Sequence, residues 1–386
     1  MSRDPGRGEA RKRVGVDFHV FDGKFQGSRS HLVGLFGELL PLCPEYDFYF
    51  FLEDVEGLRS LPAFRTANAH AAHMPEASAI RRLLWQLPRL GRQYRLDLLH
   101  TQYVSPPWPG SAQAVTIHDI LFEGYPRYFT PLFVLRSRLL TRWSAHRATL
   151  LCTVSEYSRR EIARRYGIDA KRIEVLPNAA DGTRFFSGET GRDAVERRGL
   201  KAGDYFLTVG RIEPRKNHAR LLGAYAQLAG SPPPLVIVGQ RDFRFDAFER
   251  ALAALPVTHR VLVLDDVADE ELPMLYRHAL AFVYPSFAEG FGMPPLEALA
   301  SGTPVVSSDS TAMPEVLGSA ALLIDPCDES ALASALERVR SDPVLRSRLI
   351  RKGLERAAGF SWAEAARRLA ARYRELLDPA ALAASA

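Results

Sequence analysis

The fold is decided by the stretch Tyr-Pro-Ser-Phe-Ala-Glu-Gly-Phe-Gly-Met-Pro-Pro-Leu-Glu-Ala-Leu-Ala-Ser-Gly-Thr-Pro-Val-Val, which spans residues 284–306. A short apolar strand ends at Tyr284, and a loop with two glycines follows it. The adjacent prolines mark the start of a helix, where a missing N–H costs little. Gly302 ends this helix, and Pro304 opens the next strand. A strand, a helix and a second strand in this order are the unit from which parallel sheets are built.

The same alternation extends along nearly the whole chain. Near-continuous apolar runs such as Leu235–Val238 are typical of strands covered on both faces. Residues 179–203 are polar and aperiodic, which predicts a linker. The sequence therefore predicts an α/β fold with two Rossmann-like, doubly wound domains, at 12–180 and 203–360. Strands are expected at 14–18, 47–52, 96–100, 114–117, 150–154, 173–176, 205–209, 235–238, 261–264, 281–284, 304–306 and 321–324. Helices are expected at 28–40, 219–229, 269–278, 295–300, 328–340, 343–357 and 362–378.

Composition fits an ordinary globular protein, with 47% apolar and 25% charged residues. The three cysteines lie far apart without CxxC spacing, which argues against a disulfide framework and a zinc site. No apolar run is long enough to span a bilayer, and no apolar segment follows the basic N-terminus as in a secretory signal. These features predict a cytoplasmic protein.

Basic residues concentrate in the first half of a chain whose net charge is +5. No base-stacking or helix-turn-helix pattern accompanies them, so nucleic acid is not expected as a partner. Two stretches, Ile80–Arg92 and Phe133–Trp143, mix arginine with leucine and tryptophan. Such stretches can lie on anionic lipid at the inner face of the membrane. They can equally be core-facing helices with arginine toward water, and both interpretations stay open.

The loop within 284–306 has the residues of a phosphate cradle. Gly290 and Gly292 allow backbone N–H groups to approach a ligand, and the following helix N-terminus favours negative charge. Glu289 and Glu297 are eight residues apart, and carboxylates accept hydrogen bonds from adjacent hydroxyls, so this pair can hold the two ends of a sugar nucleotide. With a helix from residue 295, Glu297 falls in the first turn, where its alternative role is to complement the helix dipole.

A second candidate segment is Thr-Val-Gly-Arg-Ile-Glu-Pro-Arg-Lys-Asn-His at 208–218. Arg211 and Lys216 lie in a loop that follows a strand and opens a helix. Fixed cations there would stabilise a diphosphate leaving group as it gains charge. Arg215 is adjacent and can substitute for either, whereas the alternative is a solvated basic surface.

In the first half, His118 and Asp119 end an apolar strand, which favours a functional over a structural histidine. The first strand leads into a loop that ends at Gly27, before a helix whose backbone donors can face the same phosphate. Gly27-Ser28 is also an ordinary helix cap.

These segments resemble the family 4 retaining glycosyltransferases of GT-B fold, in the branch with mannosyltransferase-like members. The likeness covers about 13–378. Its most specific parts are Gly-Arg…Arg-Lys-Asn (210–217), Glu-Gly-Phe-Gly-Met-Pro-Pro-Leu-Glu-Ala (289–298) and Thr-Val-Ser-Glu-Tyr-Ser (153–158), supported by 175–179 and 313–316. The resemblance implies two domains facing across a cleft, with the first binding the acceptor, the second binding the donor, and the helix at 362–378 returning to the first.

The resemblance also implies roles for individual residues. Glu289 would contact the donor hexose and Glu297 the ribose, while Arg211 and Lys216 hold the diphosphate and His118 touches the sugar. The donor-binding set completes the site: Gly27, Gly210, Gly290, Phe291, Gly292, Met293, and Val267 beside the nucleobase. Many relatives carry Gly-Gly where this chain has Gly27-Ser28, which bears on the Gly27 contact alone.

The expected reaction is retaining hexosyl transfer by front-face attack, with the leaving phosphate helping to deprotonate the acceptor and Asp119 a weaker candidate for proton transfer. GDP-mannose is the first donor expected and a UDP-sugar the second. A glycan or lipid-linked acceptor in cell-surface polysaccharide biosynthesis is expected. No cofactor or metal is implied, and the sequence has no Asp-x-Asp motif. The alternatives are a sugar-nucleotide epimerase of the same architecture and a non-catalytic sugar-nucleotide or glycan-binding scaffold.

Overall fold

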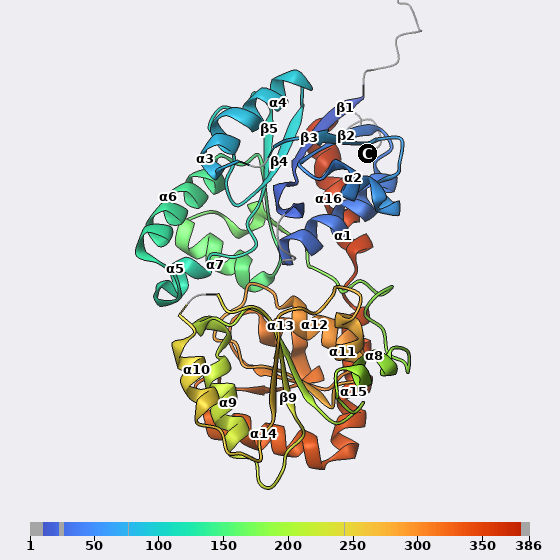
Figure 1. Ribbon diagram of the computed structural model, residues 1–386. Helices are drawn as coiled ribbons and strands as arrows, with labels where there is room; N and C mark the ends of the chain where they lie inside the picture. Colours follow the sequence, from blue (N-terminus) through green and yellow to red (C-terminus); the bar gives the residue numbers. More distant parts are fainter. Residues whose placement is uncertain (1–10, 23–26, 76, 243, 380–386) are drawn as a thin grey trace, which may run out of the picture.

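The computed structural model describes residues 11–22, 27–75, 77–242 and 244–379. Two parallel sheets form the centres of two domains (Figure 1). The first sheet has seven strands in the order β3-β2-β1-β4-β5-β6-β7. Its strands are β1 (Lys12–Asp17), β2 (Tyr46–Leu52), β3 (Ala69–His73), β4 (Leu98–Gln102), β5 (Ala112–Thr116), β6 (Leu150–Thr153) and β7 (Ile173–Val175).

The second sheet has six strands in the order β10-β9-β8-β11-β12-β13. In both sheets the order reverses beside the first strand of the domain, as in doubly wound folds, where ligands bind beyond the carboxyl ends of the strands. The strands are β8 (Phe206–Val209), β9 (Leu235–Val238), β10 (Val261–Leu264), β11 (Ala281–Tyr284), β12 (Val305–Ser308) and β13 (Ala321–Ile324).

Helices connect the strands and cover both faces of each sheet. In the first domain they are α1 (Gly27–Leu42), α2 (Val55–Ser60), α3 (Ala79–Arg81), the π-helical turn η3 (Arg82–Gln86), α4 (Leu87–Gln93), α5 (Leu121–Gly124), α6 (Pro131–Arg147) and α7 (Glu156–Tyr166). The later helices are α8 (Arg192–Arg197), α9 (His218–Ala226), α10 (Asp246–Ala253), α11 (Leu272–Arg277), α12 (Met293–Ala300), α13 (Met313–Leu317), α14 (Glu329–Ser341), α15 (Pro343–Ala358) and α16 (Trp362–Leu377). Short 3₁₀ turns are η1 (His19–Phe21), η2 (Pro62–Phe64), η4 (Pro126–Tyr128), η5 (Ala170–Arg172), η6 (Pro214–Lys216) and η7 (Gly318–Ala320).

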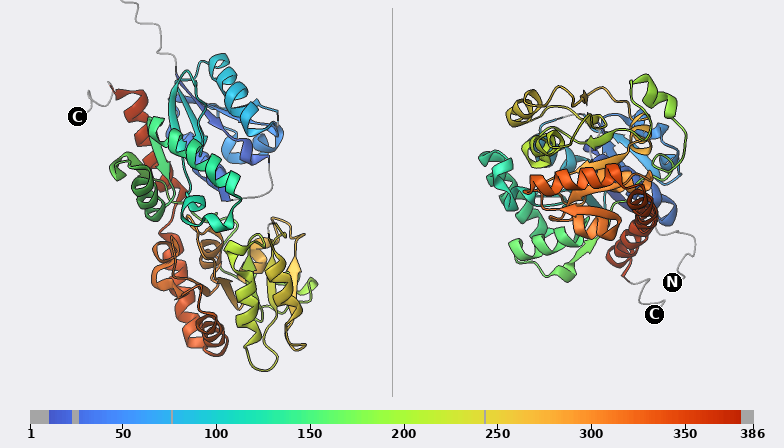
Figure 2. Two further views of the ribbon diagram at one scale, coloured as in Figure 1. Left: turned by 90° about the vertical axis from the view of Figure 1, so that its left-hand side faces the viewer. Right: turned by 90° about the horizontal axis from the view of Figure 1, so that it is seen from below.

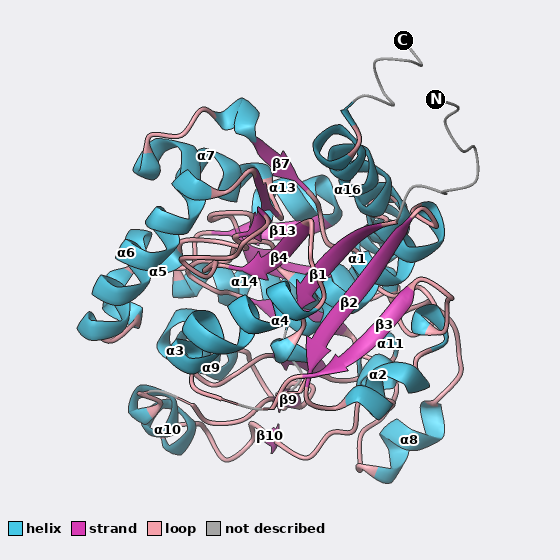
Figure 3. Ribbon diagram, turned by 90° about the horizontal axis from the view of Figure 1, so that it is seen from above, coloured by secondary structure: helices cyan, strands magenta, loops and turns pink. Residues whose placement is uncertain are grey.

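The alternation of buried residues along each strand divides the core of the first domain into layers. Val14, Phe48 and Leu98 pack against α1 and α16, while their neighbours Phe51 and Leu99 pack beneath η3 and α4. The last helix of the chain, α16, therefore returns to the first domain, where it lies beside α1 (Figures 1 and 2). Figure 3 shows these two helices on one side of the sheet and α4 and α6 on the other.

The second domain repeats this arrangement. One face of its sheet is covered by α11, α12 and α13, with core residues such as Leu296 and Val316. The opposite face is covered by α9, α10 and α14, with Leu221 and Leu336 in the core. Within the described chain, no helix combines the length and the apolar composition needed to cross a bilayer.

Three local expectations are wrong. The edge strand β3 was not expected, because Ala-His-Ala-Ala-His has little of the β-branched or aromatic character of strands. The expected linker at 179–203 contains α8, whose Val195 is buried in the core of the second domain. Helix α12 begins at Met293 rather than at residue 295, so Glu297 lies in its second turn and not in the first.

Candidate functional site

The candidate residues follow strand ends in both domains and meet where the domains meet. His118 and Asp119 follow β5, Lys216 lies in the loop after β8, and Glu289 lies in the loop after β11. Gly290 packs so closely on the first domain that a Cβ there would lie 2.6 Å from the Cβ of Asp119. The loops from the two domains are therefore in direct contact.

Glu289 is the centre of a buried polar cluster. Its Oε1 accepts hydrogen bonds from Lys216 Nζ at 2.7 Å, Ser286 Oγ at 2.6 Å and Tyr284 OH at 3.0 Å. Arg215 Nη1 lies 2.9 Å from the same oxygen. Among the described residues, none donates to Oε2, which leaves one carboxylate oxygen for a ligand.

The electrostatics of this cluster keep Glu289 ionised. Burial alone would raise the pKa of this carboxyl, but Arg215 and Lys216 lower it to about 2. Burial lowers the pKa of Lys216, while the neighbouring carboxylate opposes that change. The pKa of Arg215 is raised despite its burial, because Glu289 and Glu213 favour the charged guanidinium. The charges of Arg215 and Lys216 are balanced by Glu289 and by Glu213, whose Oε1 lies 2.6 Å from Arg215. The attraction of this site for an anionic ligand therefore depends on how closely the ligand approaches Lys216.

Arg211 is not part of this cluster. Its side chain is 50% exposed and donates from Nη1 to Asp242 Oδ2 at 2.8 Å. Arg211 and Lys216 were expected to lie together. In the structure Lys216 lies beside Glu289, and the second cation there is Arg215 rather than Arg211. Arg215 and Lys216 lie within the 3₁₀ turn η6, and Asn217, with a left-handed backbone (φ 62°), follows them.

Glu297 is 6% exposed and lies on the inner side of α12. Burial raises its pKa to about 7, and a hydrogen bond from Tyr276 OH to Oε2 at 3.1 Å opposes that rise. A carboxylate in this environment gains from any further donor, such as the hydroxyls of a ribose. Its burial excludes the alternative that it only complements the helix dipole at the surface.

His118 belongs to a buried group of histidines in the first domain. Its Nε2 lies 2.5 Å from Gln102 Oε1, and its ring meets the edge of His31 with centroids 4.8 Å apart. His31 Nδ1 in turn contacts Asn178 Oδ1 at 2.7 Å. Burial, followed by the neighbouring His31, lowers the pKa of His118 well below the usual value, so the imidazole is neutral at physiological pH.

Two helix N-termini face each other across the junction. Gly27 is the first residue of α1, and a Cβ added to it would lie 3.9 Å from Met293, the first residue of α12. Gly292 precedes α12 with φ 99°, and a Cβ there would collide with Met313, so this position requires glycine. The preceding loop residues 23–26 lie outside the described residues.

The remaining predicted residues have different environments. Phe291 is 5% exposed and packs edge-on against Phe360, so its side chain is part of the core and only its backbone can face a ligand. Gly210 has φ 146° and lies beside the methylenes of Lys216. Val267 is half-buried in the loop between β10 and α11.

Several neighbours of these residues were missed from the sequence. Tyr284 and Ser286 flank the loop and fix Glu289, and Tyr276 fixes Glu297 from α11. The first two lie inside the quoted motif, so a search for donors around Glu289 could have found them. Tyr276 carries no local signal.

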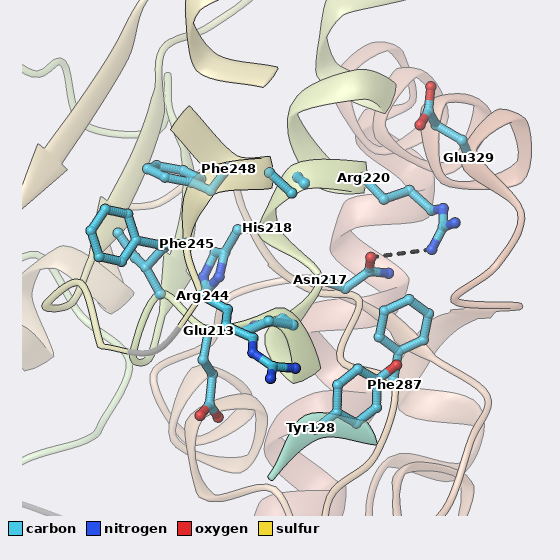
Figure 4. Close-up of a pocket in the computed structure, with 14 residues that line it drawn as sticks. Tyr128, Glu213, Asn217, His218, Arg220, Arg244, Phe245, Phe248, Phe287 and Glu329 are labelled. Atoms are coloured by element: carbon cyan, nitrogen blue, oxygen red, sulfur yellow. Dashed lines mark hydrogen bonds between the residues drawn. The ribbon is translucent and has the colours of Figure 1, made fainter. Parts of the chain in front are cut away.

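A cavity of about 380 Å³ lies beside the 212–220 segment (Figure 4). It is lined by Phe245 and Phe248 of the second domain, by Phe287, and by Tyr128 from the first domain, whose ring stacks on Phe287 with centroids 5.6 Å apart. Arg220 Nη1 donates to Asn217 Oδ1 at 3.2 Å (Figure 4). None of the predicted site residues lines this cavity, but Glu213, which pairs with Arg215 of the Glu289 cluster, does.

Comparison with known proteins follows the same division of the chain. Residues 29–184 match the model of "Glycosyltransferase Family 4", and residues 195–356 match that of "Glycosyl transferases group 1". The chain is 34% identical over 287 residues to O-antigen chain mannosyltransferase B of Escherichia coli, covering 73% of this chain and 74% of that protein. The chain belongs to the group 1 glycosyltransferases. This glycosyltransferase is also 32% identical over 238 residues to O-antigen chain mannosyltransferase RfbU of Salmonella typhimurium, covering 61% and 63%.

Solved glycosyltransferases have the same fold. Sucrose-phosphate synthase from Thermosynechococcus elongatus superposes with a TM-score of 0.74 at 21% identity, over 95% of this chain and 99% of that one. WaaG, a glycosyltransferase of lipopolysaccharide biosynthesis, gives 0.71 at 15% identity, over 95% and 100%. The expected GT-B fold, two Rossmann-like domains facing across a cleft, is confirmed.

Proposed function

We propose that this glycosyltransferase is a retaining hexosyltransferase that moves mannose from GDP-mannose to a glycan or lipid-linked acceptor in cell-surface polysaccharide biosynthesis. The observation that carries the proposal is the buried cluster of Glu289, Lys216 and Arg215 at the junction of the two domains. It places the buried cation Lys216 beside a carboxylate that has one oxygen left for a sugar hydroxyl. The second domain binds the donor, and the first binds the acceptor.

Each part of the donor has a suitable partner in the second domain. The diphosphate lies between Lys216 and the amides at the start of α12, where backbone N–H groups and the helix dipole favour an anion. Oε2 of Glu289 accepts from a hexose hydroxyl, and Glu297 accepts from the ribose. Val267 lies beside the nucleobase. Gly27 approaches the phosphate from the first domain.

The chemistry follows from where charge develops. The bond between the anomeric carbon and the diphosphate breaks, and the acceptor oxygen bonds to that carbon from the same face. The acceptor proton passes to the departing phosphate. Lys216, with Arg211 and Arg215 of the same segment, stabilises the negative charge that grows on that phosphate. This favours the transition state over the ground state. The neutral His118 donates or accepts a hydrogen bond to the sugar without carrying charge.

The choice of mannose rests on relatives. Both curated relatives described above are named as mannosyltransferases of the O-antigen chain. The second candidate donor is a UDP-sugar, because an Anabaena protein with the same fold, at 16% identity, is described in complex with UDP-glucose. No cofactor takes part in this proposal.

A panel of nucleotide sugars tests the donor and the class of enzyme together. The wild-type protein, Lys216→Ala and Glu289→Ala are incubated with GDP-mannose, UDP-glucose and UDP-N-acetylglucosamine, with and without a lipid-linked glycan acceptor. Transfer from GDP-mannose by the wild type alone supports the proposal. Turnover of the donor to an epimer without acceptor would indicate an epimerase, and binding without turnover would indicate a scaffold. The anomeric configuration of the product, measured by NMR, tests retention: an inverted linkage would refute it.

We also propose that the first domain contacts an anionic membrane surface through α6 and the α3–η3 turn. Six large apolar side chains on α6 are at least one-third exposed, among them Leu132 at 76% and Leu139 at 62%, and Trp85 on η3 is 72% exposed. Residues 79–93 and 131–147 contain eight arginines and no acidic residue. Figures 1 and 3 show α3 and α6 on the same side of the molecule. Apolar side chains between arginines fit a negatively charged lipid interface, whereas a second copy of the patch would set arginine against arginine.

Co-sedimentation with vesicles tests this contact. The wild type is expected to bind vesicles of phosphatidylcholine mixed with phosphatidylglycerol, and not phosphatidylcholine alone. The double variant Leu135→Ser/Leu139→Ser should lose this binding, while Val344→Ser, which changes an exposed side chain of α15, should retain it. Binding that does not depend on anionic lipid or on α6 would contradict the proposal.

A further inference from the structure

One segment of the second domain binds the first domain directly. The carboxylate of Glu315, on α13, accepts hydrogen bonds from the backbone N–H of Glu156 to Oε1 at 2.7 Å and of Tyr157 to Oε2 at 2.8 Å. These two N–H groups belong to the first turn of α7, where no partner exists within the helix. A carboxylate there also gains from the helix dipole. A C-terminal-domain side chain thus caps an N-terminal-domain helix.

The residue that precedes the same helix reaches back to the donor loop. Ser155 Oγ donates to the carbonyl oxygen of Gly290 at 2.6 Å, and Ser158 Oγ donates to it at 3.2 Å. Ser155 Oγ also accepts from the backbone N–H of Ser158 at 3.0 Å, as an N-cap does. All three groups are buried. The contact falls on the residue next to Glu289.

The other side of this loop is fixed within the second domain. Thr311 Oγ1 accepts from the backbone N–H of Glu289 at 2.9 Å, and Thr311 has a left-handed backbone with φ 55°. Arg356, on α15, donates to the carbonyl oxygens of Glu315 and Val316. The backbone of the 311–316 segment is thus anchored within the second domain.

We propose that Glu315, Ser155 and Ser158 are positioning residues for sugar transfer, which together hold the first domain on the donor loop in register. The inference rests on the proposed function. None of the three side chains belongs to the groups proposed to hold the donor, and each acts through Gly290 or α7. We call the contacts of Glu315, Ser155 and Ser158 between the two domains the clamp. Lys216 and Glu297 both lie in the second domain, so most contacts to the nucleotide do not require the clamp. Of the first-domain groups, Gly27 adds one contact to the phosphate and His118 touches the sugar, so the placement of the sugar does require the clamp.

This division predicts a separation of rate from affinity. Glu315→Ala and the double variant Ser155→Ala/Ser158→Ala should bind GDP as the wild type does, while kcat for transfer falls by about 100-fold, the loss that a misplacement near 1 Å can cause. Glu315→Gln keeps one acceptor oxygen and should recover part of the rate. Glu355→Ala, which removes an exposed carboxylate of α15, is the matched control and should leave both quantities unchanged.

The experiment combines calorimetry with GDP, steady-state transfer kinetics and hydrogen–deuterium exchange. In Glu315→Ala, faster exchange is expected in the peptides that contain residues 154–158 and 286–292. Wild-type kcat in the clamp variants, or a loss of GDP affinity as large as the loss of kcat, overturns the inference. A wild-type protein that transfers no sugar refutes the proposed function instead. In that case hydrogen–deuterium exchange still tests the clamp, because unchanged exchange in Glu315→Ala overturns the proposed contact.

Discussion

Glu297→Gln is the substitution for which stability and donor binding are expected to change in opposite directions. The side chain is buried, and burial raises its pKa from 4.5 to about 7. Glutamine keeps the shape and an oxygen that can accept from Tyr276 OH, which lies 3.1 Å from Oε2. The variant therefore removes a buried charge without creating a cavity.

The sign follows from which state loses its proton first. As pH rises above 4.5, the unfolded carboxyl ionises while the folded one stays protonated until about pH 7, so the wild type loses stability across this window. Two and a half pKa units correspond to about 3 kcal/mol, fully lost at pH 8, whereas at pH 5 the loss is about 1 kcal/mol. The advantage of Glu297→Gln over the wild type should thus grow by about 2 kcal/mol between these pH values.

Thermal unfolding at pH 5 and pH 8 measures this difference, which should appear as an additional rise of roughly 5 °C in the melting temperature of the variant. Donor binding should move the other way: calorimetry at pH 8 should show GDP bound about tenfold more weakly, because hydrogen bonds to a charged acceptor are lost. In the wild type, affinity should rise about tenfold from pH 6 to pH 8 as the carboxylate forms. Stability curves that run parallel across pH would refute the buried charge, and unchanged GDP affinity would refute the contact with ribose. Glu355→Gln, on the exposed side of α15, serves as the control.

Three further outcomes are expected. Arg215→Met should lower the free energy of unfolding by about 3 kcal/mol, because it removes one partner of a buried carboxylate. Arg211→Met, at a half-exposed ion pair, should lower it by about 1 kcal/mol or less. Urea titrations measure both values, and equal losses would contradict the assignment. Gly290→Ala should reduce the rate of transfer at least about tenfold, because its Cβ would meet Asp119. The control Gly182→Ala, with open space around it, should leave the rate unchanged. Full activity of Gly290→Ala would show that the domains need not meet there. His118→Asn should lower the rate of transfer without changing the shape of the pH–rate profile from pH 6 to 8. The reason is that a histidine with a strongly lowered pKa does not titrate in that range. Loss of a limb of the profile in this variant would contradict the neutrality of His118.

Most of the fold could be predicted because the strands of the second domain are apolar and sharply bounded. Four of them, such as Leu235–Val238, have the predicted limits. The edge strand β3 could not be predicted, since Ala69–His73 lies in the sheet through pairing with β2 rather than through its own propensity. The short helix α8 was missed because six residues are too few to show a period.

The segments of the candidate site could be predicted, but not the orientation of their side chains. Arg211 and Arg215 are equally basic in sequence. Only the folded loop distinguishes them, because Arg215 lies in the 3₁₀ turn that ends at Lys216 and Arg211 lies before that turn. The contact of Glu297 with Tyr276 joins two helices and depends on how they pack. The cap of Glu315 on α7 depends on how the two domains sit together, which no local pattern encodes.

The most direct test of the account is calorimetric binding of GDP-mannose to the wild type and to Lys216→Ala. If the buried cluster holds a sugar diphosphate, the wild type binds GDP-mannose, and loss of the lysine charge weakens that binding about tenfold or more, as expected for a charge-assisted contact. Failure of the wild type to bind any nucleotide sugar, or equal affinity in the two proteins, would contradict the central claim.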